Sequence, residues 1–87
     1  MRKIIYGEHK NLIHKRVKLY RMMKGLTQEQ LAAKMQTLNV TIEQQMISKI
    51  EHNSRLVTDY ELVSFSSVLG VERKDLLQDF YHEKENP

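Results

Sequence analysis

The spacing of hydrophobic residues along the chain predicts helices. Ile13 and Val17 lie on one face of a helix over residues 12–24, with Asn11 placed to cap its start and Gly25 to take the left-handed conformation that ends it. No segment alternates hydrophobic and polar residues as a half-buried strand does, and the single proline is the last residue. We therefore expect an all-α protein.

A second helix begins at a capping box, in which the side chains of Thr27 and Gln30 each accept a hydrogen bond from the other residue's backbone N–H. We expect this helix to continue through Leu38. Asn39 is placed to end it, because asparagine tolerates the left-handed conformation best after glycine.

The third predicted helix, over residues 44–52, has two possible starts. Thr41 and Gln44 have the spacing of a capping box. Ile42 and Ile47 have the spacing of a hydrophobic staple around Glu43. We favour the staple.

Two further helices follow. Thr58 and Glu61 form a second capping box, and Gly70 is placed to end the helix that begins there. The staple spacing of Val71 and Leu76 predicts a fifth, shorter helix.

The length and composition of the chain limit it to one compact domain. It has 87 residues, of which 40% are hydrophobic, and a chain of this size buries too little surface for two cores. We expect a basic N-terminal arm at residues 1–10, a five-helix domain at residues 11–81 and a polar C-terminal tail at residues 82–87.

The charge is distributed unevenly around a net value of +3. Residues 1–24 contain eight Lys or Arg and one acid, Glu8, whereas residues 72–87 contain three basic and five acidic residues. A basic half suits a polyanionic partner such as nucleic acid, although many basic helix faces only meet solvent.

The sequence also lacks the features of several functional classes. It has no cysteine and no hydrophobic run near the ~20 residues of a membrane span, and residues 1–7 lack the long hydrophobic stretch that a signal peptide contains. Its four histidines lack the spacing of a metal site, and no phosphate loop or nucleophile motif occurs. We expect a cytoplasmic protein without enzymatic activity, cofactor or metal.

The third helix carries residue types that can read DNA. Its hydrophobic residues face the core, and its outward residues are Gln45, Ser48, Lys49 and His52, with Gln44 at the flank of the first turn. Glutamine can pair with adenine, lysine can reach guanine, and serine can bond to either base in the major groove. A polar surface that only meets solvent is the alternative interpretation.

These patterns carry a resemblance to a known family. The stretches LTQEQLA at residues 26–32, ISKIE at residues 47–51 and DYEL at residues 59–62 resemble the Cro/repressor helix-turn-helix family of bacterial and phage regulators. The resemblance covers about residues 11–78 and implies a five-helix lambda-repressor-like DNA-binding domain, with the second and third helices as its motif.

The resemblance also implies roles for individual residues. The base-reading positions are Gln44, Gln45 and Lys49, with Ser48 on the same face. Backbone phosphates are bound by Thr27 and Gln28, at a helix N-terminus whose dipole favours anions, and by Arg55. Arg21 and Glu51 match a structural ion pair that fixes the third helix on the first.

Three features depart from the family pattern. Between Met35 and Ile47 the chain has about five residues more than the commonest spacing, so we expect a second helix one turn longer, as in a known variant of the family. Asn39 and Asn53 stand where glycine is usual, and Glu43 replaces a Ser or Thr cap.

Together the residues and the resemblance favour a Cro-like repressor that binds double-stranded DNA as a homodimer on a palindromic operator. One alternative is an antitoxin-like or other module that uses the same fold to bind a protein partner, through Leu19, Met22 and Met23 or through Phe80 and Tyr81. The other is a helical interaction module that has lost DNA binding.

Overall fold

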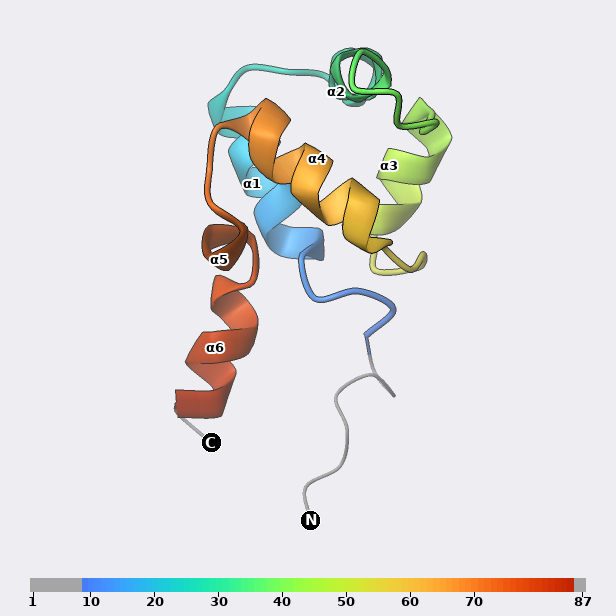
Figure 1. Ribbon diagram of the computed structural model, residues 1–87. Coiled ribbons are helices and arrows are strands. Elements are labelled where there is room, and N and C mark those ends of the chain that lie inside the picture. The colour runs from blue at the N-terminus through green and yellow to red at the C-terminus, as the bar shows by residue number, and fades with distance from the viewer. Residues whose placement is uncertain (1–8, 86–87) are drawn as a thin grey trace.

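The computed structural model describes residues 9–85, which form six helices and no strand (Figure 1). Residues 1–8 of the expected basic arm and residues 86–87 of the expected tail lie outside this range. The helices are α1 (His14–Met23), α2 (Gln28–Gln36), α3 (Gln44–Glu51), α4 (Asp59–Leu69), α5 (Arg73–Leu76) and α6 (Gln78–Glu85). The all-α prediction is confirmed, and α6 is an additional helix that includes residues 82–85 of the expected tail.

Two of the predicted helix starts form as expected. Thr27 Oγ1 accepts a hydrogen bond from Gln30 N at 3.0 Å, and Gln30 Oε1 accepts one from Thr27 N at 2.9 Å. The equivalent box at Thr58 and Glu61 starts α4. Both boxes satisfy backbone N–H groups that a helix N-terminus otherwise leaves unpaired.

The first and third helices start without a capping box, the first contrary to expectation and the third by the favoured staple. The N-cap of α1 is Ile13 and not Asn11, although Asn11 Oδ1 accepts a hydrogen bond from Ile13 N at 3.0 Å. Helix α3 begins after Glu43, whose side chain makes no capping hydrogen bond, while Ile42 and Ile47 are fully buried. The hydrophobic staple is therefore the start that the chain uses.

Left-handed residues end four of the helices. Gly25, Asn39, Asn53 and Gly70 have φ values of 72°, 64°, 59° and 70°. The end of α2 is a Schellman motif. Val40 N donates to Met35 O at 3.3 Å, and Asn39 N donates to Gln36 O at 3.0 Å. The α-helix itself ends at Gln36, two residues earlier than expected. Hydrogen bonds between residues three apart then continue the turn to Asn39.

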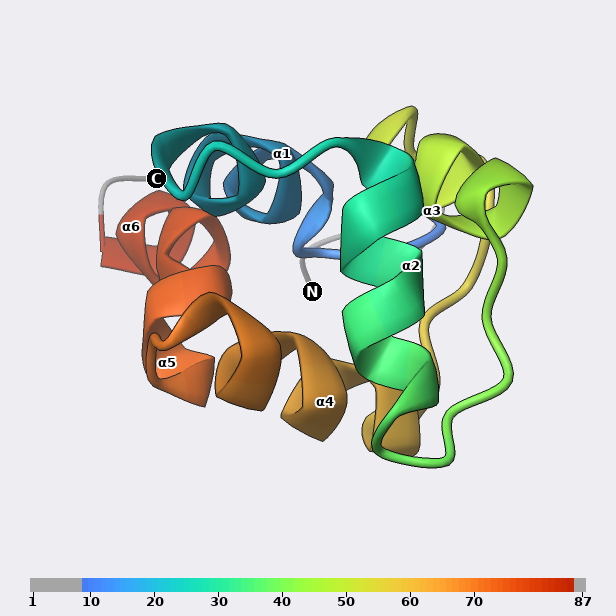
Figure 2. The same ribbon diagram turned by 90° about the horizontal axis from the view of Figure 1, so that it is seen from above.

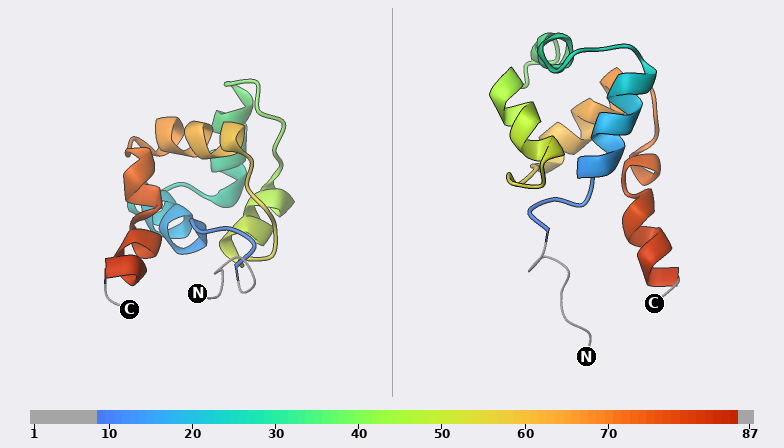
Figure 3. Two further views of the ribbon diagram at one scale, coloured as in Figure 1. Left: turned by 60° about the horizontal axis from the view of Figure 1, so that its bottom comes forward. Right: turned by 180° about the vertical axis from the view of Figure 1, so that it is seen from behind.

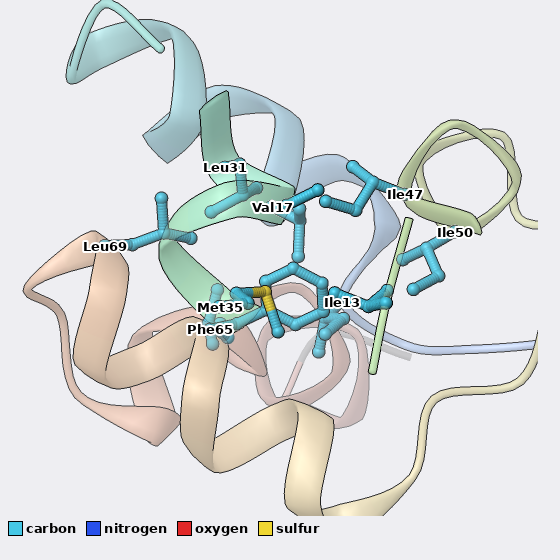
Figure 4. Close-up of a cluster of buried hydrophobic side chains, with 11 residues drawn as sticks. Ile13, Val17, Leu31, Met35, Ile47, Ile50, Phe65 and Leu69 are labelled. Carbon is cyan, nitrogen blue, oxygen red and sulfur yellow. The ribbon is translucent and has the colours of Figure 1, made fainter. Parts of the chain in front are cut away.

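Helices α2 and α3 lie side by side at one edge of the molecule (Figure 2). The core beneath them takes residues from five of the six helices, from the segment before α1 and from the connection between α2 and α3, with Phe65 of α4 and Met35 of α2 near its centre (Figure 4). Its buried members are Ile13, Val17, Leu31, Ala32, Met35, Ile42, Ile47, Ile50, Phe65, Leu69 and Leu76. Burial of this surface holds the helices together, at roughly 25 cal/mol per Å² of apolar area.

Helix α6 projects away from the other helices (Figures 1 and 3). It is attached to α1 by Arg16, whose Nε and Nη2 donate to Asp79 Oδ1 at 3.2 and 3.1 Å. The hydrogen bond to Asp79 raises the pKa of Arg16. Because both side chains are partly exposed, this pair contributes little to the free energy of unfolding and mainly sets the direction of α6.

Candidate nucleic-acid interface

The carboxylate of Glu51 lies at the junction of the first three helices. Its side chain is only 2% exposed and receives two hydrogen bonds from Arg21, from Nε to Oε2 at 2.7 Å and from Nη2 to Oε1 at 3.1 Å. The Arg21 side chain is itself 12% exposed, and its Nη1 donates to Leu26 O at 2.8 Å. The structure thus brings together the two residues that the resemblance paired.

A chain of hydrogen bonds runs from this carboxylate to the start of α3. Gln28 Nε2 donates to Glu51 Oε1 at 3.0 Å, and Gln44 Nε2 donates to Gln28 Oε1 at 2.6 Å. The carboxylate can only accept, so it determines the orientation of both amides. Gln44 keeps its carbonyl oxygen and one N–H, and these are the acceptor and donor needed to pair with adenine.

The other predicted base-reading residues lie along the same helix. Gln45 and Lys49 are exposed, and within the described part of the chain neither side chain forms a hydrogen bond or ion pair. Ser48 is half-buried. The outer face of α3 therefore presents two amides and an ammonium group that can bond to base edges.

The N-terminus of α2 stands beside Gln44. Thr27 is exposed, and because its oxygen accepts the capping bond, its hydroxyl proton can be donated outward. A shallow depression here is lined by Arg21, Thr27, Gln28, Glu29 and Gln44. Free N–H groups and the helix dipole favour a phosphate at this end, while the acidic Glu29 in the first turn opposes one.

Arg55 has a structural partner that was not predicted. Its Nη1 and Nη2 donate to Glu61 Oε1 and Oε2 at 2.9 and 3.1 Å, and Nη1 also donates to Leu56 O at 3.0 Å. Three of its five N–H groups are thus used, and two remain for a phosphate. Because the capping-box pattern already explained Glu61, nothing in the sequence indicated that this buried carboxylate also binds an arginine.

Exposed hydrophobic residues cover part of the outer surface of α1. Leu19, Met22 and Met23 are 42%, 61% and 72% exposed. Of the pair expected near the end of the chain, Tyr81 is exposed and Phe80 is half-buried. Further exposed hydrophobic residues, which were not expected to form a surface, are Leu38, Leu56, Tyr60 and Val63.

The described residues contain no group of three or more His, Asp or Glu side chains that could hold a metal ion. None of the helices within residues 9–85 has the length and apolar character that crossing a membrane requires.

This arrangement defines a DNA-binding protein of the helix-turn-helix class, in which α2 and α3 form the motif. The model of the helix-turn-helix family matches residues 17–76, which span α2 to α5 and most of α1. The chain belongs to the Cro/C1-type helix-turn-helix family of DNA-binding regulators. Sequence-specific DNA binding is accordingly its activity, in a family that is generally non-enzymatic. Comparisons with curated proteins and with solved structures gave no match.

The buried ion pair generates a prediction about stability. Glu51→Gln leaves the Arg21 cation without its counter-charge, and removing one partner of a buried pair costs about 3–5 kcal/mol. We expect a loss near the lower limit, about 3 kcal/mol in the free energy of unfolding, because the new amide still accepts a hydrogen bond. Urea denaturation measures this loss.

The matched control is Glu72→Gln, because the ion pair of Glu72 with Lys74 is nearly three-quarters exposed on both sides. Its effect should stay below about 1 kcal/mol. Equal losses in the two variants would contradict a special role for the buried carboxylate.

Proposed function

We propose that this protein is a transcriptional repressor that binds a palindromic DNA site as a homodimer, with α3 in the major groove. The observation that carries this proposal is the hydrogen-bonded chain from Glu51 through Gln28 to Gln44. A base-reading amide must be held in a fixed orientation to discriminate between bases, and this chain holds one at the start of α3.

Base reading is assigned to the outer face of α3. Gln44 and Gln45 pair with adenines through their amide groups, Lys49 reaches guanine O6 or N7, and Ser48 bonds to a neighbouring base. Their support is the exposure of Gln45 and Lys49 and the fixed amide of Gln44.

Phosphate binding is assigned to residues on either side of that face. Thr27 offers its hydroxyl, Gln28 and the α2 N-terminus offer N–H groups, and Arg55 offers the two N–H groups that Glu61 and Leu56 O leave unused. These contacts set the register of the protein on the duplex and carry no sequence information themselves.

A homodimer provides the required length of site. One eight-residue helix reads only a few base pairs, whereas two copies related by a twofold axis read two half-sites about 34 Å apart. A dimer bound over a promoter would prevent transcription by occlusion.

A second candidate function rests on the exposed hydrophobic residues of α1. Leu19, Met22 and Met23 fall on one side of that helix, and methionine is favoured at adaptable protein-binding surfaces. An antitoxin-like module would use this surface for a protein partner, with DNA binding as its secondary activity.

Selection of binding sites from random duplex DNA with the full chain tests the proposed function. We expect an enriched palindrome whose half-sites lie one helical turn apart, and sedimentation should show two chains for each duplex. Failure to enrich any sequence would reject the proposal and leave the partner-binding candidate. A monomer on an asymmetric site would reject only the homodimer.

Gln45→Ala tests the base-reading assignment. Loss of a bidentate contact should weaken binding to the selected site by about 1–3 kcal/mol and hardly change binding to random duplex. Gln78→Ala, at an exposed glutamine of α6, is the matched control and should change neither affinity. Titrations measure both affinities, and equal losses on the two DNAs would contradict base reading by Gln45.

The phosphate contact of Arg55 needs a variant that does not leave Glu61 buried without a partner. In the double variant Arg55→Gln/Glu61→Gln, both charges are removed together, and we expect the slope of log K against log salt to fall by about one. Glu61→Gln alone keeps the cation, so its slope should not fall. Equal slopes in the double variant and the unaltered protein would show that Arg55 touches no phosphate.

A further inference from the structure

Two asparagines join the segment before α1 to the C-terminal end of α3. Asn11 is 8% exposed, and its Nδ2 donates to Ile50 O at 3.1 Å and to Arg55 O at 2.9 Å. In return, Asn53 Oδ1 accepts from Lys10 N at 2.8 Å and from Asn11 N at 3.3 Å. We name this reciprocal set of bonds between Asn11 and Asn53 and their backbone partners the asparagine clamp.

The clamp acts at the C-terminal end of α3. Ile50 O is one of the last carbonyl groups of α3, which lack the usual partner four residues later; it accepts a hydrogen bond from Asn53 N at 3.0 Å in the closing turn, and Asn11 Nδ2 adds one from outside the helix. Asn53 adopts the left-handed conformation that ends the helix, with a φ of 59°, so one residue both terminates α3 and accepts the bonds from the preceding segment.

The clamp also reaches the loop that carries Arg55. The backbone carbonyl of Arg55 is bonded to Asn11, while its guanidinium is bonded to Glu61. Figure 3 (right) shows the segment before α1 passing beside the loop after α3. The main chain and the side chain of this proposed phosphate-binding residue are thus fixed from two directions.

The two ends of α3 are held by different groups. At its start, Gln44 is bonded to Gln28, and at its last residue Glu51 is bonded to α1 and α2. Neither set of bonds reaches the loop beyond the helix. Asn11 lies outside residues 17–76, which the family model matches, so the clamp adds a contact from beyond the matched segment.

We propose that Asn11 and Asn53 are positioning residues for DNA recognition, which set the angle of α3 and the place of the Arg55 loop against the duplex. This inference rests on the proposed reading role of α3. The asparagines touch no base themselves. Loss of the clamp therefore lowers binding to the selected site, where several base contacts must align, more than binding to random DNA, which depends on charge alone.

The quantity to measure is the ratio of the affinities for the selected site and for a random duplex of equal length. A variant that is partly unfolded loses affinity for both DNAs by the same factor, so the ratio does not respond to stability alone. Asn53→Gly keeps the left-handed backbone and removes the acceptor, and should lower the ratio about three- to tenfold.

Two variants provide controls. Asn39→Gly makes the same substitution at a residue with nearly the same φ, 64°, that ends α2, and its ratio should stay within about twofold of the original. Asn53→Asp keeps an oxygen acceptor and tolerates the left-handed conformation, so it should preserve the ratio. An unchanged ratio in Asn53→Gly, or equal losses in Asn53→Gly and Asn39→Gly, would overturn the proposal.

A measurement on the free protein separates this proposal from the proposed function. If no DNA sequence is selected, hydrogen exchange still reports the clamp. The backbone N–H of Asn11 donates to Asn53 Oδ1, so it should exchange faster in Asn53→Gly than in the original chain. Faster exchange with no selected site would reject the DNA-reading function and leave the clamp as a structural contact, which overturns its positioning role. Unchanged exchange would show that the clamp does not form.

Discussion

The buried carboxylate of Glu51 is the group on which the geometry of the reading surface depends. A carboxylate that leaves water must be matched by donors at hydrogen-bond distance, and here these come from Arg21 of α1 and Gln28 of α2. Buried pairs of this kind add little net stability, because the cost of desolvation offsets most of the attraction. Their consequence is geometric: three helices must adopt one arrangement for the carboxylate to be satisfied. The orientation of the Gln44 amide follows from that arrangement.

Much of the fold could be predicted from the sequence because its signals are local. The capping box of Thr27 and Gln30 and the left-handed Asn39 depend only on neighbouring residues, and both are present in the structure. The choice of a hydrophobic staple over a capping box at the start of α3 could also be made, since Ile42 and Ile47 form a staple only if Glu43 lies outside the helix. The residues on the outer face of α3 could be predicted directly, because the helical period determines which residues point away from the core.

The features that were missed depend on residues far apart in the chain. Asn11 could be identified as a capping residue from its type, but nothing in the sequence indicated that its amide would bond to carbonyls 39 and 44 residues away. The pairing of Arg55 with Glu61 was hidden because the local capping box already explained the acid. Helix α6 begins after Leu77, whose side chain has no polar group to cap a helix, and it is attached by the pair of Arg16 and Asp79, which are 63 residues apart. Such contacts arise from tertiary packing and leave no periodic pattern.

The lengthened connection between α2 and α3 is the feature that could most easily have displaced the reading helix. Two contacts hold this connection in place and so keep α3 from moving. Gln36 Nε2 donates a hydrogen bond to Ile42 O at 2.8 Å, and the Ile42 side chain is fully buried beneath the start of α3. The extra residues instead form a turn at the opposite end of α2 from Thr27 (Figure 2). There Leu38, with the next three residues, forms one wall of a groove whose other wall is Thr58 and the first two turns of α4. The added length therefore changes the surface beside α4, while α3 stays fixed by its staple and by the network around Glu51.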